Sequence, residues 1–278
     1  MKKEVLVLTG AGQIGMAIAR RVGHGKKIFV ADWKIENAHR TASMMAEAGF
    51  DTVPFEVDIS SKQSILTLIE SSLKEGEIAF FINAAGVSPS QASIEQIIAI
   101  DLYGTALLLE AFGKVIKQGG AGVTISSQSG HRMPALTAEE DRLLATLAPD
   151  ALLNLDMVKP ENIRDTLHAY QIAKRCNVKR VMAEAIKWGE RGARINSISP
   201  GIIMTPLALD EMNGPRGDFY KNMFAKSPAR RPGTADEVAT VAALLLSDKG
   251  SFITGTDILI DGGATASYFY GPLQPALH

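Results

Sequence analysis

The chain alternates short apolar runs with stretches of helical periodicity from one end to the other. The apolar runs contain many β-branched residues and have the length of buried strands; they span residues 4–8, 27–31, 52–57, 77–82, 122–126, 193–198 and 257–260. Between them, apolar residues recur at spacings of three and four, which is typical of amphipathic helices. This alternation predicts an α/β fold with a doubly wound, parallel, seven-stranded sheet that helices cover on both faces.

Capping boxes predict where four of the helices begin. The Ser or Thr and the Gln or Glu three residues later are Ser60 and Gln63, Ser93 and Gln96, Thr137 and Glu140, and Thr234 and Glu237. The helix that opens at Ser93 is expected to continue through Asp101 to Lys117, and the helix that contains Tyr170 to end at Gly189 or Gly192. After residue 268 the chain contains prolines and is expected to be irregular.

Two segments interrupt the alternation. Residues 131–165 contain two short helical patterns, starting at Thr137 and at Pro149, whose leucines must be buried against something, so we expect a packed helical insertion near the active site. Residues 206–224 contain Gly214-Pro215 and are interpreted as a substrate flap. The substrate pocket is expected to be built from both segments. No linker or repeat divides the chain, so residues 1–278 are interpreted as a single domain.

Composition narrows the function. The 278 residues carry a net charge of −1, and no run of Lys and Arg exceeds two residues, which argues against nucleic acid or an anionic membrane as a partner. The single cysteine, Cys176, excludes an intrachain disulfide and a cysteine-cluster metal site, and no group of His, Asp and Glu has metal-ligand spacing. No apolar run reaches membrane-spanning length, so a cytoplasmic protein is expected.

A glycine-rich turn follows the first strand. Gly10, Gly12 and Gly15 have the spacing Gly-x-Gly-x-x-Gly, with Gln13 and Ile14 between the last two, and a helical pattern continues from Ile14. Glycines allow backbone amides and a helix N-terminus to approach a pyrophosphate. An isolated motif of this kind can be an ordinary turn, but the strand before it and the helix after it predict a dinucleotide site of the Rossmann type.

Asp32 ends the second strand, 20 residues after Gly12, where an acidic side chain binds the ribose hydroxyls of an adenosine. Its carboxylate would repel a 2′-phosphate, and Trp33 rather than an arginine follows it. The sequence therefore favours NAD over NADP as the cofactor, with Lys34 as the nearby cation that could offset Asp32.

Tyr170 and Lys174 are four residues apart, so on a helix their side chains lie on one face. A free tyrosine titrates near pH ~10 and is a poor acid or base at neutral pH, but a neighbouring ammonium favours the phenolate. With Ser127 to hold the reacting oxygen, the pair is a candidate proton-transfer group. Taken alone, the pair could also be a half-buried tyrosine beside a solvated lysine.

Taken together, these motifs resemble those of the short-chain dehydrogenase/reductase family over essentially the whole chain. The resemblance is carried by Thr9-Gly10 to Gly15, Asp58-Ile59, Asn83-Ala84-Ala85-Gly86, Ser127, Tyr170 with Lys174, Pro200-Gly201 to Thr205, and Asp261-Gly262-Gly263. Each motif is modest alone, but their joint order is highly specific.

The resemblance implies a role for each site residue. Tyr170 is expected to be the general acid/base, Lys174 to hydrogen-bond the nicotinamide ribose and lower the pKa of Tyr170, and Ser127 to polarise the substrate carbonyl. The other positions are expected to hold the dinucleotide: Gly10, Gly12, Gln13, Ile14 and Gly15 at the pyrophosphate, Asp32 at the ribose, Asp58 and Ile59 at the adenine, Asn83, Ala84, Ala85 and Gly86 along the floor, and Pro200, Gly201, Ile203 and Thr205 towards the carboxamide.

Three features depart from the family pattern. The glycine motif is one residue shorter than the usual Gly-x-x-x-Gly-x-Gly. Asp101 stands where the family has an asparagine that supports the proton relay, so Asp101 is a further candidate catalytic residue. Ser127 and Tyr170 are 43 residues apart, more than in most members, and the insertion between them is similar to that of a subgroup, the bacterial 3α-hydroxysteroid dehydrogenase/carbonyl reductases.

The expected activity is NAD-dependent interconversion of a secondary alcohol and a ketone by hydride transfer. An NADPH-preferring carbonyl reductase and a non-catalytic dinucleotide-sensing protein on the same fold are the alternatives. Many family members pair their Tyr-bearing helices across a dimer axis. A homodimer or homotetramer is therefore expected, in which the insertion obstructs or remodels that contact and residues 234–263 retain another; a surface elaboration that leaves assembly unchanged is the alternative.

Overall fold

The computed structural model describes residues 3–214 and 217–275. Its strands are β1 (Glu4–Thr9), β2 (Lys27–Asp32), β3 (Asp51–Glu56), β4 (Glu77–Asn83), β5 (Ala121–Ile125), β6 (Arg194–Pro200) and β7 (Asp257–Ile260). They form one seven-stranded sheet in the order β3-β2-β1-β4-β5-β6-β7, and all neighbouring pairs are parallel. The predicted fold is confirmed, and the strand boundaries agree with the prediction to within about two residues, as expected of pattern-based boundaries.

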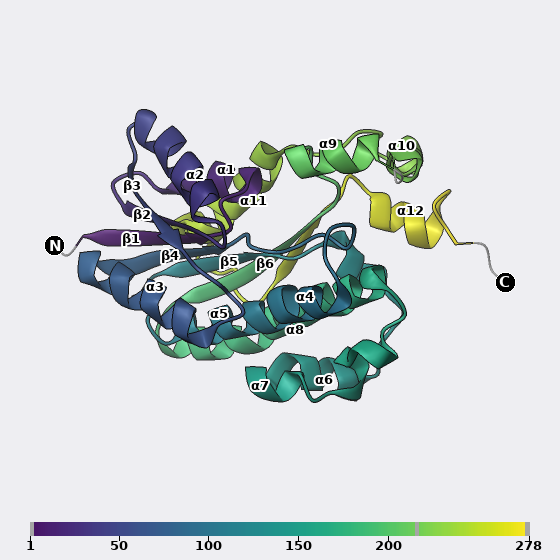
Figure 1. Ribbon diagram of the computed structural model, residues 1–278, viewed down its shortest axis with the longest axis horizontal. Coiled ribbons are helices and arrows are strands. Elements are labelled where there is room, and N and C mark those ends of the chain that lie inside the picture. Colours follow the sequence, from purple (N-terminus) through teal and green to yellow (C-terminus); the bar gives the residue numbers. More distant parts are fainter. Residues whose placement is uncertain (1–2, 215–216, 276–278) are drawn as a thin grey trace.

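Helices cover both faces of the sheet (Figure 1). One face carries α1 (Gln13–Val22), α2 (Ile35–Glu47) and α11 (Ala235–Leu246), and the other carries α3 (Lys62–Glu75), α5 (Thr105–Gly113) and α8 (Thr166–Glu190). Successive residues of a strand point to opposite faces, so Leu6 and Leu8 of β1 join the core beneath α1 and α11, while Val5 and Val7 join the core beneath α3 and α5. All four side chains are completely buried, which explains why β1 is continuously apolar.

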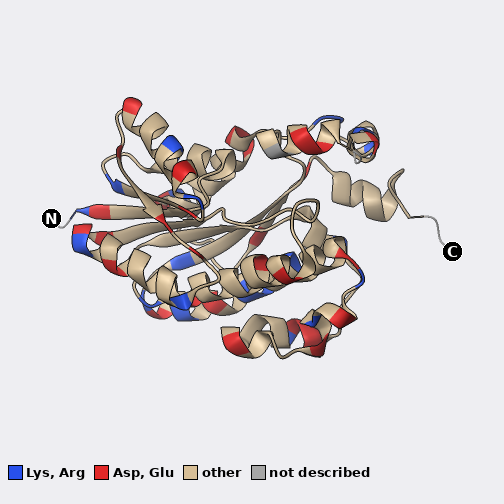
Figure 2. Cartoon of the chain, in the orientation of Figure 1, with Lys and Arg blue, Asp and Glu red and all other residues tan. Residues whose placement is uncertain are grey.

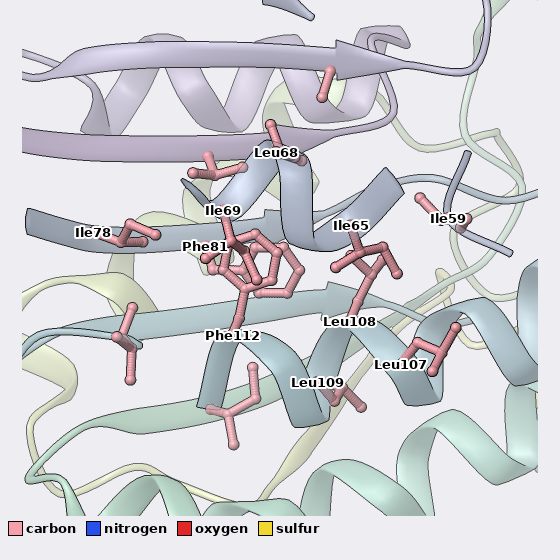
Figure 3. Packing of buried hydrophobic residues seen from close by; sticks show 14 of the residues in the cluster. Ile59, Ile65, Leu68, Ile69, Ile78, Phe81, Leu107, Leu108, Leu109 and Phe112 are labelled. Atoms are coloured by element: carbon pink, nitrogen blue, oxygen red, sulfur yellow. The ribbon is translucent and has the colours of Figure 1, made fainter. Parts of the chain in front are cut away.

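The core beneath α3 and α5 is built on aromatic rings (Figure 3). Phe81 of β4 and Phe112 of α5 stack with ring centroids 3.9 Å apart and an interplanar angle of 11°. Trp188 of α8 packs beside Phe81, and its indole Nε1 donates a hydrogen bond to the Leu109 carbonyl at 3.1 Å. Because this polar atom is satisfied, the whole indole can be buried and hold α8 against α5.

One long helical stretch runs from Ile94 to Gly113 as α4 (Ile94–Ile97), a π-helical segment η1 (Ile98–Gly104) and α5. It opens with the predicted capping box of Ser93 and Gln96, but it ends before Lys117, and the π segment was not predicted. Among the described residues, this stretch is long and apolar enough to cross a membrane by length and composition, and 67% of its most apolar window is buried inside the protein. That burial is typical of a helix in a protein core.

The insertion forms a separate layer on the outer side of α8 (Figure 1). A 3₁₀ turn η2 (Gln128–His131) precedes α6 (Ala138–Thr146), α7 (Pro149–Leu152) and the 3₁₀ turns η3 (Asp156–Val158) and η4 (Pro160–Asn162). Leu144 and Leu152 are completely buried against α8 and η1, in a third core that also encloses Cys176. Arg180 of α8 is only 2% exposed, and its guanidinium donates to the carbonyls of Leu144 at 3.2 Å and Leu147 at 2.6 Å. One buried arginine therefore satisfies carbonyls at the C-terminal end of α6.

The C-terminal part of the chain contains four further elements: α9 (Pro206–Asn213), α10 (Gly217–Lys226), the 3₁₀ turn η5 (Asp248–Gly250) and α12 (Ala264–Tyr270). The expectation of an irregular chain after residue 268 was therefore wrong as far as Tyr270, and α12 lies near α10 (Figure 1). The capping box at Ser60 was also wrong, because the Ser60 hydroxyl binds the Asp58 carboxylate at 2.6 Å. Ser61 caps α3 instead and accepts a hydrogen bond from the amide of Ser64.

Candidate functional site

A cavity of about 890 Å³ lies beyond the carboxyl ends of the central strands. Its walls come from the turns that follow β4, β5 and β6, from the first turns of α8, from the flap helices α9 and α10, and from α12 with the residues after it. In open parallel sheets, ligands bind at this edge, close to the point where the strand order reverses. Here that reversal lies between β1 and β4.

The glycine-rich turn has the space that a phosphate group needs. Gly10 has φ +88°, and a Cβ atom there would lie 2.4 Å from the Ala85 amide nitrogen, so only glycine allows the turn after β1 to pack on the turn after β4. Gly12, by contrast, has no neighbouring atom within 4 Å of the place its Cβ would take. Gly12 is also the N-cap of α1 and provides no side-chain hydrogen bond to that helix end. Open space beside unoccupied helix amides fits a pyrophosphate.

Asp32 is fixed at the end of β2. One carboxylate oxygen accepts the Ala11 amide at 2.9 Å, and the other accepts the Lys34 amide at 3.0 Å. The side chain is therefore tied to the glycine-rich turn itself, as a residue that binds the adjoining ribose should be. The Trp33 side chain points away into solvent and is 66% exposed.

The other predicted cofactor residues divide into two groups. Ala84, Ala85 and Gly86 line the cavity, as do Ile14, Pro200, Gly201, Ile203 and Thr205. The remaining predicted residues do not line it: Gly10, Gly12, Gln13, Gly15, Asp32, Asp58, Ile59 and Asn83. Asn83 is 1% exposed beneath the floor, where its Oδ1 accepts hydrogen bonds from Thr9 and the Ala85 amide and so shapes the turn above it.

Asp58 and Ile59 make structural contacts within the protein. The Asp58 carboxylate accepts hydrogen bonds from the amide and hydroxyl of Ser60, and Ile59 is buried in the core beneath α3 and α5. Their predicted contact with adenine remains a prediction.

Ser127, Tyr170 and Lys174 meet on one wall of the cavity. Ser127 follows β5, Tyr170 and Lys174 lie four residues apart on the first turns of α8, and the Ser127 side chain lowers the pKa of Tyr170. The Lys174 side chain is 4% exposed, and its Nζ lies 5.2 Å from the centroid of the Tyr170 ring. The reading of this pair as a tyrosine beside a solvated lysine is therefore wrong, because the lysine is buried.

Asp101 is the fourth member of this group. It is completely buried on the π segment η1, and its Oδ1 lies 3.6 Å from Lys174 Nζ and accepts the Val87 amide at 3.1 Å. A Cβ atom on Gly86 would lie 2.6 Å from that Oδ1, so a glycine there leaves room for the carboxylate. The second oxygen, Oδ2, is buried without a hydrogen-bond partner. A buried acceptor of this kind invites a donor from a ligand or a water molecule.

Burial is the largest single influence on the pKa of Tyr170, Lys174 and Asp101. Burial raises the pKa of Tyr170, the charge of Lys174 lowers it, and Asp101 raises it again, with a raised pKa as the net result. The predicted effect of Lys174 is thus present but is outweighed in the protein alone. Burial on its own would lower the pKa of Lys174, but Asp101 and Tyr170 raise it above its ordinary value, so Lys174 stays an ammonium. Burial also raises the pKa of the Asp101 carboxyl, against the opposing effect of Lys174.

The substrate end of the cavity differs from the prediction. The flap lines it through Ala208, Glu211, Phe219, Tyr220, Asn222, Met223 and Lys226, but α6 and α7 provide no lining residue, and within residues 131–165 only Arg132 reaches the cavity. The expectation that the insertion builds the pocket was therefore wrong for its helices, which pack on the outer side of α8. The missing wall comes from α12 and the following residues, through Tyr268, Pro272, Leu273 and Gln274.

Sequence reasoning missed a polar group that joins the flap to the β4 turn. The Glu211 carboxylate accepts hydrogen bonds from Ser88 at 2.5 Å, from Ser90, and from the Tyr220 hydroxyl at 2.5 Å. No sequence pattern connects Glu211 with Ser88 and Ser90, which lie more than a hundred positions before it, so only the fold could place them together.

In the described residues, neither the distribution of charged side chains nor the arrangement of metal-ligating side chains indicates a second binding site. Basic and acidic side chains are interspersed over the outer helices, and most of the sheet is without charge (Figure 2). Among residues 3–214 and 217–275, no group of three or more His, Cys, Asp and Glu side chains could hold a metal ion.

Comparison with known proteins points to one family. A family model described as enoyl-(acyl carrier protein) reductase matches residues 10–139 and 135–265. The chain is 39% identical over 272 residues to the short-chain dehydrogenase/reductase bsc3 of Alternaria brassicicola, covering 96% of this chain and 97% of that protein. It is 30% identical over 273 residues to D-threitol dehydrogenase of Mycolicibacterium smegmatis, covering 95% and 93% of the two chains.

Solved structures agree with this assignment. The crystal structure of levodione reductase superposes with a TM-score of 0.76 and 26% sequence identity, covering 96% of this chain and 98% of that one. The family model spans most of the chain, and the bsc3 alignment spans nearly all of it. The chain belongs to the short-chain dehydrogenase/reductase family and is an oxidoreductase that acts on CH–OH groups.

Proposed function

We propose that the protein is an NAD-dependent oxidoreductase that interconverts a secondary alcohol and a ketone, with Tyr170 as the acid/base. The observation that carries the proposal is the enclosed group of Ser127, Tyr170 and Lys174 on the wall of a cavity that also meets the glycine-rich turn. A tyrosine beside a buried ammonium can exist as the phenolate at a lower pH than a buried tyrosine alone. Bound NAD supplies the hydride acceptor or donor.

The chain's own residues would handle the proton. In the oxidative direction, the Tyr170 phenolate takes the proton from the substrate hydroxyl while the Ser127 hydroxyl donates a hydrogen bond to the same oxygen. In the reductive direction, Tyr170 returns that proton to the carbonyl oxygen. Lys174 stabilises the phenolate by its charge in both directions, and Asp101 keeps Lys174 protonated.

Asp32 supports the choice of NAD over NADP. Its carboxylate is held by two backbone amides and so cannot rotate freely away from a 2′-phosphate. Leaving a phosphate beside a fixed carboxylate is unfavourable unless a cation intervenes. The Lys34 amide is bonded to Asp32, but no ion pair joins the Lys34 ammonium to it. In the alternative, an NADPH-preferring carbonyl reductase, Lys34 is the cation that would offset Asp32 beside the 2′-phosphate.

The substrate is proposed to be a small molecule with a secondary hydroxyl or ketone group. Two of the relatives are named for threitol and levodione, a polyol and a diketone by their names. We further propose that the protein is a cytoplasmic homodimer or homotetramer. The non-catalytic alternative has no support from the relatives, which are named as dehydrogenases and reductases.

A panel of secondary alcohols with NAD and NADP, and of ketones with NADH and NADPH, tests the proposal. Turnover is measured as the change in absorbance at 340 nm. It is expected for some of the alcohols and ketones, with NAD and NADH as the better cofactors. Turnover with NADP and NADPH alone would assign the protein to the carbonyl reductases instead. Binding of NAD without turnover of any member of the panel would count against the acid/base role of Tyr170.

A further inference from the structure

Arg132 places a positive charge inside the candidate active-site cavity. It follows the turn η2, which begins directly after Ser127, and its side chain lines the cavity together with Ser127 and Tyr170. The turn itself is fixed, because the Ser127 hydroxyl accepts the Ser129 amide at 3.1 Å and the Ser127 carbonyl accepts the Gly130 amide at 3.1 Å. At roughly 2 Å of rise per residue of a 3₁₀ turn, the Cα atoms of Arg132 and Ser127 are on the order of 10 Å apart.

The guanidinium has little to bind within the protein. Within the described residues, its one side-chain hydrogen bond is a weak contact from Nη1 to the Met223 sulfur at 4.0 Å, and its Cζ lies 5.7 Å from the centroid of the Tyr268 ring. No carboxylate in that part of the chain forms a salt bridge with Arg132. The guanidinium nitrogen atoms that lack a partner are not fully enclosed and are accessible to solvent.

Two neighbouring side chains, Asp261 and Tyr268, act on Arg132, but among the described residues neither forms a hydrogen bond with its guanidinium. Asp261 is close enough to raise the pKa of Arg132, but its two oxygens accept the backbone amides of Gly263 at 2.9 Å and Thr265 at 2.6 Å. Tyr268 offers only the face of its ring, and such a contact replaces none of the five N–H hydrogen bonds that a guanidinium can make. Burial lowers the pKa of Arg132, against the opposing effects of Asp261 and Tyr268.

A second polar group points to the same end of the cavity. Gln128 is 5% exposed and lines the cavity, and its Oε1 is buried without a hydrogen-bond partner. Its Nε2 contacts the same Met223 sulfur as Arg132 does, at 3.7 Å. Lys226 of α10 also lines the cavity and adds a second positive charge. Two cations are thus placed on the flap side of the cavity, beside a nearly buried amide.

We propose that Arg132 binds an oxyanion of the substrate, a carboxylate or a phosphate, so that the substrate class is a small secondary hydroxy acid and the corresponding oxo acid. This inference rests on the proposed function and names the substrate of the same site. The planar guanidinium fork pairs with two oxygens of such a group.

Matched acid and ester substrates test the proposal. The probes are 3-hydroxybutanoate, 4-hydroxypentanoate and 5-hydroxyhexanoate, each compared with its methyl ester at saturating NAD. The acid is expected to have a kcat/KM at least ~10-fold higher than its ester for one or more pairs, the difference that one charge-assisted hydrogen bond produces. Arg132→Gln is expected to reduce this ratio at least ~10-fold through KM, and Arg132→Lys to leave an intermediate ratio, because lysine keeps the charge and loses the fork.

A control variant and a binding measurement complete the experiment. Arg142→Gln removes an arginine that pairs with Glu139 on the exposed side of α6, and it should leave the ratio unchanged. Calorimetry of glutarate and of inorganic phosphate with the NAD-saturated protein detects the anion site without turnover. The anion whose affinity falls in Arg132→Gln identifies the group that Arg132 binds.

The outcomes separate this inference from the proposed function. Oxidation of the esters with no preference for any acid, together with glutarate and phosphate affinities that do not depend on Arg132, would overturn the oxyanion site and leave the proposed function standing. Arg132-dependent binding of either anion without turnover of any alcohol or ketone would support the site and overturn the proposed function. If Arg132→Gln fails to fold, Arg132→Lys decides, and an unchanged ratio with unchanged anion affinity overturns the inference.

Discussion

The Oδ1 of Asp101 lies 3.6 Å from the Nζ of Lys174, and both side chains are almost completely enclosed by protein. A buried ion pair of this kind stabilises little by itself, but removal of one partner leaves an uncompensated charge. Within the pair, Asp101 raises the pKa of Lys174 and so favours its protonated state. The two charges act in opposite directions on Tyr170, whose pKa Lys174 lowers and Asp101 raises.

Asp101→Asn is expected to retain activity and to shift its pH dependence. Loss of the carboxylate removes a charge that raises the pKa of Tyr170, so the phenolate should form at lower pH. In the oxidative direction, the acidic limb of the kcat/KM profile should therefore move to lower pH. Asp156→Asn, at an exposed position on η3, is the matched control and should not move the limb. An inactive Asp101→Asn protein with an unchanged fold would show that the carboxylate itself is required.

Tyr170→Phe is expected to lower kcat at least ~10²-fold, the lower end of the contribution of a general acid/base. The affinity for NAD should change little, because the substitution removes only the hydroxyl. Stopped-flow turnover and calorimetric titration with NAD measure the two quantities on one preparation. Near-normal turnover on a confirmed substrate would contradict the role of Tyr170.

Asp32→Asn is expected to weaken the preference for NAD over NADP at least ~10-fold. The amide keeps one acceptor oxygen, for either the Ala11 or the Lys34 backbone amide, and removes the charge that opposes a 2′-phosphate. Dissociation constants for both cofactors in the wild type and the variant, from calorimetry, check the ratio. Equal affinities for NAD and NADP in the wild type would mean that Lys34 already neutralises Asp32.

Arg180→Met is expected to destabilise the insertion locally. The substitution removes two charge-assisted hydrogen bonds to the carbonyls of Leu144 and Leu147, each worth about 1.5–3 kcal/mol. Hydrogen exchange should rise most in residues 138–152, and the free energy of unfolding should fall. Arg142→Met, which removes an exposed ion pair with Glu139 on α6, should change the free energy of unfolding by less than ~1 kcal/mol. Equal effects of both variants would show that Arg180 does not anchor the insertion.

Phe252→Ser is expected to reduce the oligomeric mass. Phe252 is fully exposed within residues 234–263, and Met182 and Ile186 on α8 are also exposed. A second copy that covers the Phe252 side chain would remove its apolar surface from water. Light scattering measures the mass, and Leu73→Ser, on α3, is the control. An unchanged mass would exclude Phe252 from the subunit contact.

The parts of the fold that follow from periodicity could be predicted, because burial on both faces forces continuous apolar strands. Val5 to Leu8 is an example, since each residue belongs to one of the two cores. Arg132 and Tyr268 could not be predicted as neighbours, because their contact depends on how η2 and α12 meet in space. The net pKa of Tyr170 could not be predicted either, because spacing reveals the nearby Lys174 but not the burial that outweighs it.

Because Asp101 lies in the π-helical segment η1, the position of its carboxylate depends on the number of residues in that segment. Asp101 lies within η1, between Ile97 in the third core and Phe112 in the first, and both ends of the stretch are fixed by packing. A π turn holds one residue more than an α turn, and each residue of an α-helix rotates the next by about 100°. A one-residue deletion in η1 would then turn the carboxylate away from Lys174 without any exchange of side chains. Insertions and deletions, and not only substitutions, can thus switch this contact on or off among chains of the same fold.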